Sequence, residues 1–473
     1  MEFKRDIYQE LLEWKTSANH HALEVRGARQ IGKTFIVDKF CKDNFKNVYK
    51  LDLGNPETYN TLLVLFGEAF FNPSLGAISN AGTPLEMFQR IFPDFVDNVN
   101  NILFFDEIQD SAFLYNMIRP INRQLKCRLI VSGSFLGHTI NKEFFQPTGD
   151  LHTIIMRSMS FPEVLSAMGW RDMYETASLY GDSEPKIYEQ LNFALEFYLR
   201  FGGHPKVVEY ALNKNMKFAD AELEFIVERF CKESQTYNKA ISDNVRMKDY
   251  LIGVATLMLM GSEKSKPFKR DLGTIVGETN RQSVNNALSW FWESGIIEPC
   301  HRFNDGKKHD ITRDCRFYFT DPGIAQYISR RTGVHPSAIS GHMHESFAYG
   351  CIRDMRIPSY ECPHFSSFGA GELDFMFFIH SSGKTHGVGI EVKAGKSTGK
   401  TIQGMFNKKI LSYMIYAKGD TKGGRAEKSF TIPLPLLGRF NIFDYVTNDI
   451  ANDDADMLEK IQQAGFPSEQ VVS

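Results

Sequence analysis

The segment at residues 22–40 constrains the fold more than any other part of the chain. It reads ALEVRGARQIGKTFIVDKF, in which an apolar strand is followed by a loop bounded by glycines and then by a helix. The loop matches the pattern GxxxxGK[ST] in the strand-to-helix context that this pattern requires. Glycines let backbone N–H groups converge on phosphate oxygens, Lys33 neutralises terminal phosphates, and the Thr34 hydroxyl can take one Mg²⁺ position. We therefore expect a phosphate site that consists of Gly27, Ala28, Arg29, Gln30, Ile31, Gly32, Lys33 and Thr34.

Two further strands carry polar residues at their ends. NILFFDEI (101–108) is apolar up to Asp106 and Glu107. We expect this strand to lie beside the strand that precedes the loop, with Asp106 near a metal ion and Glu107 polarising a water molecule. The alternative for this pair is a helix-capping turn. CRLIVSGS (127–134) ends in Ser134, which either faces the terminal phosphate or belongs to a plain strand-to-helix turn.

Length and composition limit the classes of protein to which the chain can belong. At 473 residues it exceeds a single hydrophobic core, so we expect two or three domains. A net charge of −3 means that any contact with nucleic acid must come from a local basic patch. No stretch approaches the ~18–20 apolar residues of a membrane span. The seven cysteines include no CxxC pair, which indicates reduced thiols and a cytoplasmic protein.

Residues 250–303 form a pattern of their own. Three helical stretches are followed by the strand-like GIIEPCHRF, an order that suggests a winged helix-turn-helix. Polar residues at the start of the third helix suit base edges and the preceding basic residues suit phosphates, although winged helices also serve as packing modules. Trp290, Phe291 and Trp292 are expected in the core. The residues that could contact DNA are Lys264, Lys266, Lys269, Arg270, Asn280, Arg281, Gln282, Ser283, Asn285 and Asn286.

A second set of charged residues lies near the C-terminus. GELDFMFF and GVGIEVK are expected to form a hairpin in which Glu391 and Lys393 share one face and meet Asp374 on the partner strand. Glu345, on an earlier helix, can add a carboxylate. Carboxylates with a lysine can hold Mg²⁺, polarise a phosphodiester and position a hydroxide, with Lys393 stabilising the charge that develops. The alternative is a surface hairpin whose charges are only solvated.

These motifs together resemble a known family. The chain resembles bacterial and archaeal AAA+ superfamily ATP-binding proteins that have a C-terminal domain of unknown function. The motifs that it shares with them, in the same order, are RGARQIGKT, FFDEIQ, IVSGS, SMSFPEVL, FGGHPKVV, FYFTDPGIAQYI, HESFAYG and GELDF with IEVKAGK. The resemblance implies an α/β P-loop NTPase domain at 1–165, a helical region at 166–248, a winged-helix domain at 249–330 and an α/β domain like the PD-(D/E)xK nucleases at 331–473. It also implies ATP and Mg²⁺ as cofactors and assembly into homo-oligomers. It supports the nuclease interpretation at Asp374, Glu391 and Lys393.

The sequence departs from this family at one place. Many members have Gly-Arg shortly before the SMSF segment, where the arginine is a candidate to act on the nucleotide of a neighbouring subunit. This chain has Gly149 and Asp150 instead. Either Arg157 or Arg123 takes over this role, or activation between subunits is weak.

Three hypotheses about function follow. The first is a Mg²⁺-dependent ATPase whose nucleotide state controls a nuclease-like domain that acts on double-stranded DNA. The second is a nucleotide-dependent regulatory or interaction switch that cuts nothing. A small-molecule kinase is the third, and it fits less well because Asp106 and Glu107 suit water activation better than transfer to a hydroxyl.

Overall fold

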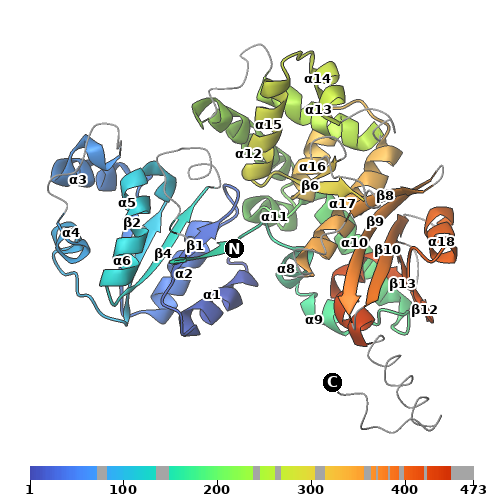
Figure 1. The fold of residues 1–473 in the computed structure, drawn as a ribbon, viewed down its shortest axis with the longest axis horizontal. Coiled ribbons are helices and arrows are strands. Elements are labelled where there is room, and N and C mark those ends of the chain that lie inside the picture. Colours follow the sequence, from blue (N-terminus) through green and yellow to red (C-terminus); the bar gives the residue numbers. More distant parts are fainter. Residues whose placement is uncertain are drawn as a thin grey trace, which may run out of the picture.

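The computed structural model has an N-terminal α/β unit, a helical middle and a C-terminal mixed sheet (Figure 1). No described helix is long and apolar enough to cross a membrane. The structure describes residues 1–71, 82–134, 147, 149–237, 246–260, 268–303, 315–355, 364–368, 371–381, 384–393, 399–419 and 423–448.

The N-terminal unit is a five-stranded parallel sheet of order β2-β3-β4-β1-β5 with helices on both faces. One face packs on α1 and α2 and the other on α3 to α6, which explains why the central strands are continuously apolar. The strands are β1 (Ala22–Arg26), β2 (Asn47–Asp52), β3 (Asn101–Asp106), β4 (Arg128–Gly133) and β5 (Leu151–Ile155). The helices are α1 (Ile7–Thr16), α2 (Lys33–Asn44), α3 (Pro56–Phe66), α4 (Pro84–Ile91), α5 (Ala112–Asn116) and α6 (Ile118–Gln124).

The expected position of the Asp106 strand is wrong. β3 does not lie beside β1, because β4 is inserted between them and pairs with both, through Leu23↔Ile130 on one side and Phe104↔Ile130 on the other. Leu129, Ile130 and Val131 of β4 are all buried, so this strand suits a position covered on both faces. Asp106 nevertheless reaches the end of the sheet at which the GxxxxGKT loop lies, because parallel strands end at a common edge.

The helical middle leads from the first sheet to the second. The three helices and the strand expected between residues 250 and 303 are present as α13, α14, α15 and β6. The helices are α8 (Phe161–Ala167), α9 (Arg171–Thr176), α10 (Pro185–Phe201), α11 (Pro205–Leu212), α12 (Met216–Tyr237), α13 (Met247–Met260), α14 (Phe268–Val276), α15 (Arg281–Glu293) and α16 (Pro322–Ser329).

The C-terminal sheet is mixed and has the order β12-β13-β11-β10-β9-β8-β6-β7. β9 and β10 form the expected antiparallel hairpin, with Phe375 opposite Ile390. The strands are β6 (Ile297–Arg302), β7 (Cys315–Phe319), β8 (His364–Phe368), β9 (Gly371–Ser381), β10 (Lys384–Lys393), β11 (Tyr413–Lys418), β12 (Gly424–Ala426) and β13 (Ser429–Pro433). The remaining elements are α17 (Pro336–Asp354), α18 (Lys400–Asn407) and the 3-10 helix η5 (Leu434–Arg439).

One hydrophobic core joins the helical middle to this sheet. It runs from Met159 to Val446, and it includes side chains of α10, α13, α15 and α17 as well as β10 and β11. The antiparallel pair of β6 and β7 is also the edge of the C-terminal sheet because β6 pairs with β8. The core therefore spans the expected domain boundaries at residues 248 and 330, and the sheet spans the boundary at 330. These domain boundaries remain sequence-based predictions.

Candidate nucleotide site

The loop at residues 27–34 has a backbone that depends on its glycines. Gly32 adopts the left-handed φ of 91° and precedes the first residue of α2. A Cβ atom on Gly27 would lie 2.1 Å from the carbonyl oxygen of Met156. Arg5, which the sequence gave no reason to select, braces the loop by donating to Ile31 O at 2.8 Å and to Arg157 O at 2.7 Å. The loop is thus tied to the segment that follows β5.

Lys33 lies inside this loop. Its Nζ donates to Gly27 O at 3.0 Å and to Ala28 O at 2.8 Å, and the side chain is buried. Burial lowers the pKa of Lys33 to about 8, against the raising effect of the charges of Glu107 and Asp106. An anion at the loop would favour the charged ammonium further.

Asp106, at the end of β3, is only 2% exposed and accepts a hydrogen bond from the hydroxyl of Ser132. Burial raises the pKa of its carboxyl, while the hydroxyl of Thr34 acts to lower this pKa. Glu107 follows with a left-handed φ of 53°, and Gln109 donates to its carboxylate. The structure therefore brings Thr34, Asp106 and Glu107 to the edge of the sheet where Lys33 lies.

Ser134 lies next to these residues and is 4% exposed. Its backbone N–H donates to Gln109 Oε1 at 3.3 Å, whereas its hydroxyl has no hydrogen-bond partner within the described residues. A buried hydroxyl without a partner is costly, and it is a group that a ligand can satisfy. Residues 135–146 lie outside the described residues, so the alternative of a plain strand-to-helix turn is not tested.

The two arginines considered in place of Asp150 have different surroundings. Arg157 is held within the chain, with its Nη2 3.2 Å from Glu298 Oε1 on β6. Arg123 has a side chain that is 63% exposed and donates to Asp150 at 3.0 and 2.9 Å. Arg119 also pairs with Asp150, at 3.0 Å. Arg123 is therefore the more accessible of the two.

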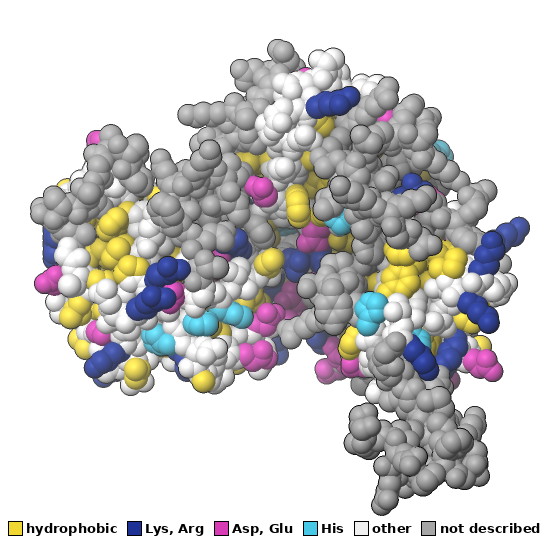
Figure 2. Space-filling model, viewed as in Figure 1, with side chains coloured by type: hydrophobic (Ala, Val, Ile, Leu, Met, Phe, Trp, Pro, Cys, Tyr) yellow, Lys and Arg dark blue, Asp and Glu magenta, His cyan; other side chains and the backbone are white. Residues whose placement is uncertain are grey.

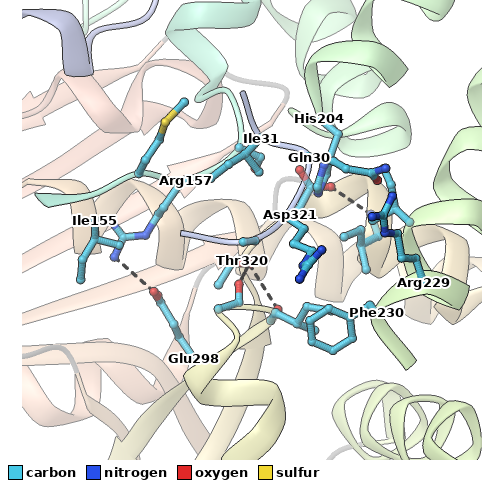
Figure 3. A pocket seen from close by; sticks show the side chains of 18 of the residues that line it. Gln30, Ile31, Ile155, Arg157, His204, Arg229, Phe230, Glu298, Thr320 and Asp321 are labelled. Atoms are coloured by element: carbon cyan, nitrogen blue, oxygen red, sulfur yellow. Dashed lines mark hydrogen bonds and ion pairs between the residues drawn. The ribbon is translucent and has the colours of Figure 1, made fainter. Parts of the chain in front are cut away.

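A cavity of about 140 Å³ lies between the loop and the helical middle. Its apolar wall consists of Ile31, Ile155, Ile226, Phe230, Ile296 and Ile324. Arg157 and Glu298 face each other on one side, and Arg229 and Phe230 lie on the other (Figure 3). Acidic and basic side chains also gather in the hollow between the N-terminal unit and the rest of the molecule (Figure 2).

The FGGHPKVV motif positions part of this cavity. The N–H of Gly203 donates to Asp321 Oδ2 at 2.9 Å, and a Cβ on Gly203 would lie 1.9 Å from Met159 O. His204, which is 2% exposed, lines the cavity. Pro205 lies 3.9 Å from the position of a Cβ on Gly32. Gly203, by its close approach to Met159, and Gly32, by its contact with Pro205, thus let the helical middle pack against the loop. The sequence did not reveal this role.

The C-terminal charged residues also come together. Asp374 Oδ2 accepts from Val392 N at 2.7 Å, and Lys393 Nζ lies 2.7 Å from Glu391 Oε1. Glu391 is 4% exposed, and its Oε2 has no hydrogen-bond partner within the described residues. Burial, together with the charges of Glu345 and Glu391, raises the pKa of Asp374 to about 8. Burial raises the pKa of Glu345 as well.

Nothing in this cluster defines a metal site. Across the described parts of the chain, no three His, Cys, Asp or Glu side chains are grouped so that they could hold a metal ion. Glu345, Asp374 and Glu391 therefore remain predicted ligands.

The basic residues of the suggested DNA contact are only partly covered by the structure. Lys264 and Lys266 lie outside the described residues, as do the side chains of Lys269 and Arg270. Trp290 and Phe291 are in the core as expected, but Trp292 is 53% exposed and lines the cavity. The expectation for Trp292 is thus wrong, because α15 turns this residue away from the core and toward the loop.

Comparison with known proteins agrees with the description of the N-terminal unit. Residues 19–165 match the family described as an AAA domain, so the N-terminal unit is a P-loop domain of that type. No curated protein matches the chain.

Several solved structures are similar to this chain, all at low values. The Walker-type ATPase PABY2304 of Pyrococcus abyssi has 13% identity and a TM-score of 0.42, covering 69% of this chain and 96% of that one. The Orc1 protein of Aeropyrum pernix, in complex with DNA, has 13% identity and a TM-score of 0.31, with 73% and 93% coverage. RuvB of Thermotoga maritima, a Holliday junction branch migration motor, has 12% identity and a TM-score of 0.25, with 64% and 91% coverage. At these values the likenesses give no evidence about function.

Proposed function

Since residues 19–165 form an AAA domain, we propose that the chain is a Mg²⁺-dependent ATPase. The observation that carries this proposal is the meeting of Lys33, Thr34, Asp106 and Glu107 at one edge of the first sheet. These residue types at a GxxxxGKT loop are those that nucleotide hydrolysis requires.

Each residue has a distinct part in the proposed reaction. The backbone N–H groups of residues 27–34 bind phosphate oxygens, and Lys33 exchanges its contacts with the loop carbonyls for the terminal phosphates. Thr34 and Asp106, which lie at the same edge of the sheet and interact electrostatically, would hold Mg²⁺, directly or through water. When bound, Mg²⁺ neutralises charge on the phosphates. Glu107 orients the attacking water, and the unpartnered hydroxyl of Ser134 donates to the terminal phosphate.

We place the base of the nucleotide in the adjacent cavity, on the side of Ile155 that lies across from Arg229 (Figure 3). The cavity begins at Ala28, Arg29, Gln30 and Ile31, so a nucleotide held by its phosphates at the loop reaches it directly. Its apolar wall suits a flat aromatic ring, as ligand pockets generally do.

Hydrolysis assays on substituted proteins test this proposal. Lys33→Ala should lose ATP binding, whereas Glu107→Gln should bind ATP but hydrolyse it at least ~100-fold more slowly. Lys39→Ala, which changes an exposed lysine of the same helix α2, should behave as wild type. Equal hydrolysis by wild type and Glu107→Gln would contradict the role of Glu107. Each protein is assayed with and without double-stranded DNA, since stimulation by DNA would identify the partner.

We further propose that the C-terminal cluster is a nuclease-like site under the control of the ATPase. The supporting observation is that Lys393 lies 2.7 Å from Glu391, that Asp374 accepts from the intervening Val392 N–H, and that both carboxyl groups are buried, where they are costly without a function. Cleavage of double-stranded DNA with Mg²⁺ or Mn²⁺ is the assay, and Asp374→Asn and Lys393→Ala should abolish it. Lys384→Ala, at the exposed start of β10, is the control.

The alternative is a nucleotide-dependent switch that cuts nothing. If wild type cleaves no DNA while Asp374→Asn leaves ATP hydrolysis and its response to DNA unchanged, the switch becomes the better account. In either case we propose assembly into homo-oligomers, with Arg123 approaching the nucleotide of a neighbouring copy.

A further inference from the structure

One ion pair connects the phosphate loop directly to the helical middle. Arg29, within the loop, has its Nε 2.9 Å from Glu233 Oε1 on α12. Arg229, one turn earlier on α12, lies 3.6 Å from the same carboxylate oxygen. Both partners are largely enclosed, with side-chain exposures of 26% for Arg29 and 13% for Glu233. Arg29 is thus held by a carboxylate from outside the AAA domain.

This ion pair also lines the cavity, on the Arg229 side and across from the place given to the base (Figure 3). The charge of Arg29 acts on Lys33 and on Asp110, and the charge of Glu107 acts on Glu233. The carboxylate therefore shares its surroundings with the residues that would receive the terminal phosphate.

Glu233 is poorly suited to this place when it stands alone. Burial raises the pKa of Glu233 and the charge of Glu107 raises it further, while Arg29 and Arg229 act in the opposite direction. The anion is therefore sustained by two guanidinium groups. A terminal phosphate at the loop carries more negative charge than a carboxylate and presents several acceptor oxygens to arginine. It would compete for Arg29 and repel Glu233.

We propose that the Glu233 carboxylate pairs with Arg29 when no nucleotide is bound, and that the terminal phosphate of a nucleoside triphosphate replaces Glu233 as the partner of Arg29. Binding of the triphosphate would thus separate Arg29 from Glu233. The inference rests on the proposed nucleotide site and assigns two residues the task of detecting the terminal phosphate. Arg229 stays on α12 and keeps the freed carboxylate paired. Since α12 packs on α11, α13 and α16, loss of the contact reaches the helical middle directly.

The test is the affinity for nucleotide of Glu233→Gln, measured on the full chain by calorimetry with Mg²⁺ and a non-hydrolysable ATP analogue or ADP. Removing the competing charge should tighten binding of the ATP analogue roughly 5–10-fold, a typical size for coupling between groups in contact. Binding of ADP should change less, because ADP lacks the phosphate that competes. Glu222→Gln is a matched control on the same helix, since Glu222 is equally enclosed and pairs with Lys206 at 3.0 Å. Its affinity for either nucleotide should equal that of wild type.

The opposite result has a clear meaning. If Glu233 only fastens α12 to the loop, Glu233→Gln should weaken binding of both nucleotides or leave it unchanged, and the inference is overturned. A second measurement does not depend on the folding of one variant. In the Arg29→Gln background the gain from Glu233→Gln should disappear, whereas a gain that persists would also refute the inference. Absence of ATP binding by wild type would instead overturn the proposed function, and the inference with it.

Discussion

Through Arg157, Glu298 forms another electrostatic link between the N-terminal unit and the rest of the molecule, and its replacement by Gln has a calculable effect. The carboxylate accepts from Arg157 Nη2 at 3.2 Å and from Arg353 Nη1 at 2.9 Å, and its side chain is 19% exposed. Removing one partner of a buried ion pair costs ~3–5 kcal/mol. Since Arg353 keeps Asp354 at 2.8 Å, we expect about 1.5–3 kcal/mol of destabilisation. With an unfolding entropy of ~2.1 cal/mol/K per residue over 473 residues, that corresponds to a fall in melting temperature of roughly 1.5–3 °C.

The pH dependence of this effect has a definite sign. Although burial alone would raise it, the charges of Arg353 and Arg157 hold the pKa of Glu298 below its ordinary value. A carboxylate whose pKa is lower in the folded than in the unfolded protein stabilises the fold above the unfolded pKa of about 4.3. This stabilisation is lost as the pH falls through the folded pKa. The difference between wild type and Glu298→Gln should therefore be complete at neutral pH and shrink in acid.

Thermal unfolding followed by intrinsic fluorescence at several pH values measures both quantities. Glu175→Gln is the control, because Glu175 pairs with Arg171 at 2.6 Å in a position where its side chain is 46% exposed. Such exposed pairs contribute ~0–1 kcal/mol. A melting shift for Glu298→Gln no larger than that of Glu175→Gln, or one independent of pH, would refute the reasoning.

Three other predictions concern the nucleotide site. Because burial lowers the pKa of Lys33 to about 8, the affinity of wild type for ATP should fall as the pH rises through that value, and calorimetry on Lys33→Met should find weak binding without this dependence. Gly203→Ala should lower both melting temperature and ATP affinity, because its Cβ would lie 1.9 Å from Met159 O; a variant with wild-type affinity would show that the FGGHP turn does not position the site. Arg123→Ala should lower ATP hydrolysis per molecule at high protein concentration and leave ATP affinity unchanged, whereas a rate equal to wild type at every concentration would argue against its action in a neighbouring copy.

Sequence predicted best where the chemistry is local. The GxxxxGKT loop and the Asp106-Glu107 pair are short patterns whose spacing is set by backbone geometry, and the structure brings Lys33 and Asp106 together. The order of the strands was predicted wrongly because a parallel crossover does not require strands that share a site to be neighbours. β4 lies between β1 and β3, and since all three strands are buried on both faces, no apolar pattern in the sequence records their order.

Sequence patterns do not predict contacts between residues that lie far apart in the chain. Arg29 and Glu233 are ordinary charged residues in their own segments, and only the packing of α12 against the loop gives the pair a meaning. The same holds for Trp292, which belongs to an apolar cluster in sequence but is 53% exposed beside the cavity. Arg5 precedes a helix with no unusual pattern and still braces the loop.

The ion pairs Arg29–Glu233 and Arg157–Glu298 differ in whether a bound nucleotide would break them. Arg29 belongs to the phosphate loop, so its pairing with Glu233 competes directly with a phosphate. Arg157 follows β5 and lies outside the phosphate loop, and its carbonyl accepts from Arg5, so its pairing with Glu298 draws on no residue of that loop. The links lie on opposite sides of the cavity, as the positions of Arg157 and Arg229 show (Figure 3). A nucleotide that separates Arg29 from Glu233 would therefore leave the Arg157–Glu298 contact in place. That contact continues through Arg353 into α17, the helix that carries Glu345, so the fixed side of the junction is the one that leads to the C-terminal cluster.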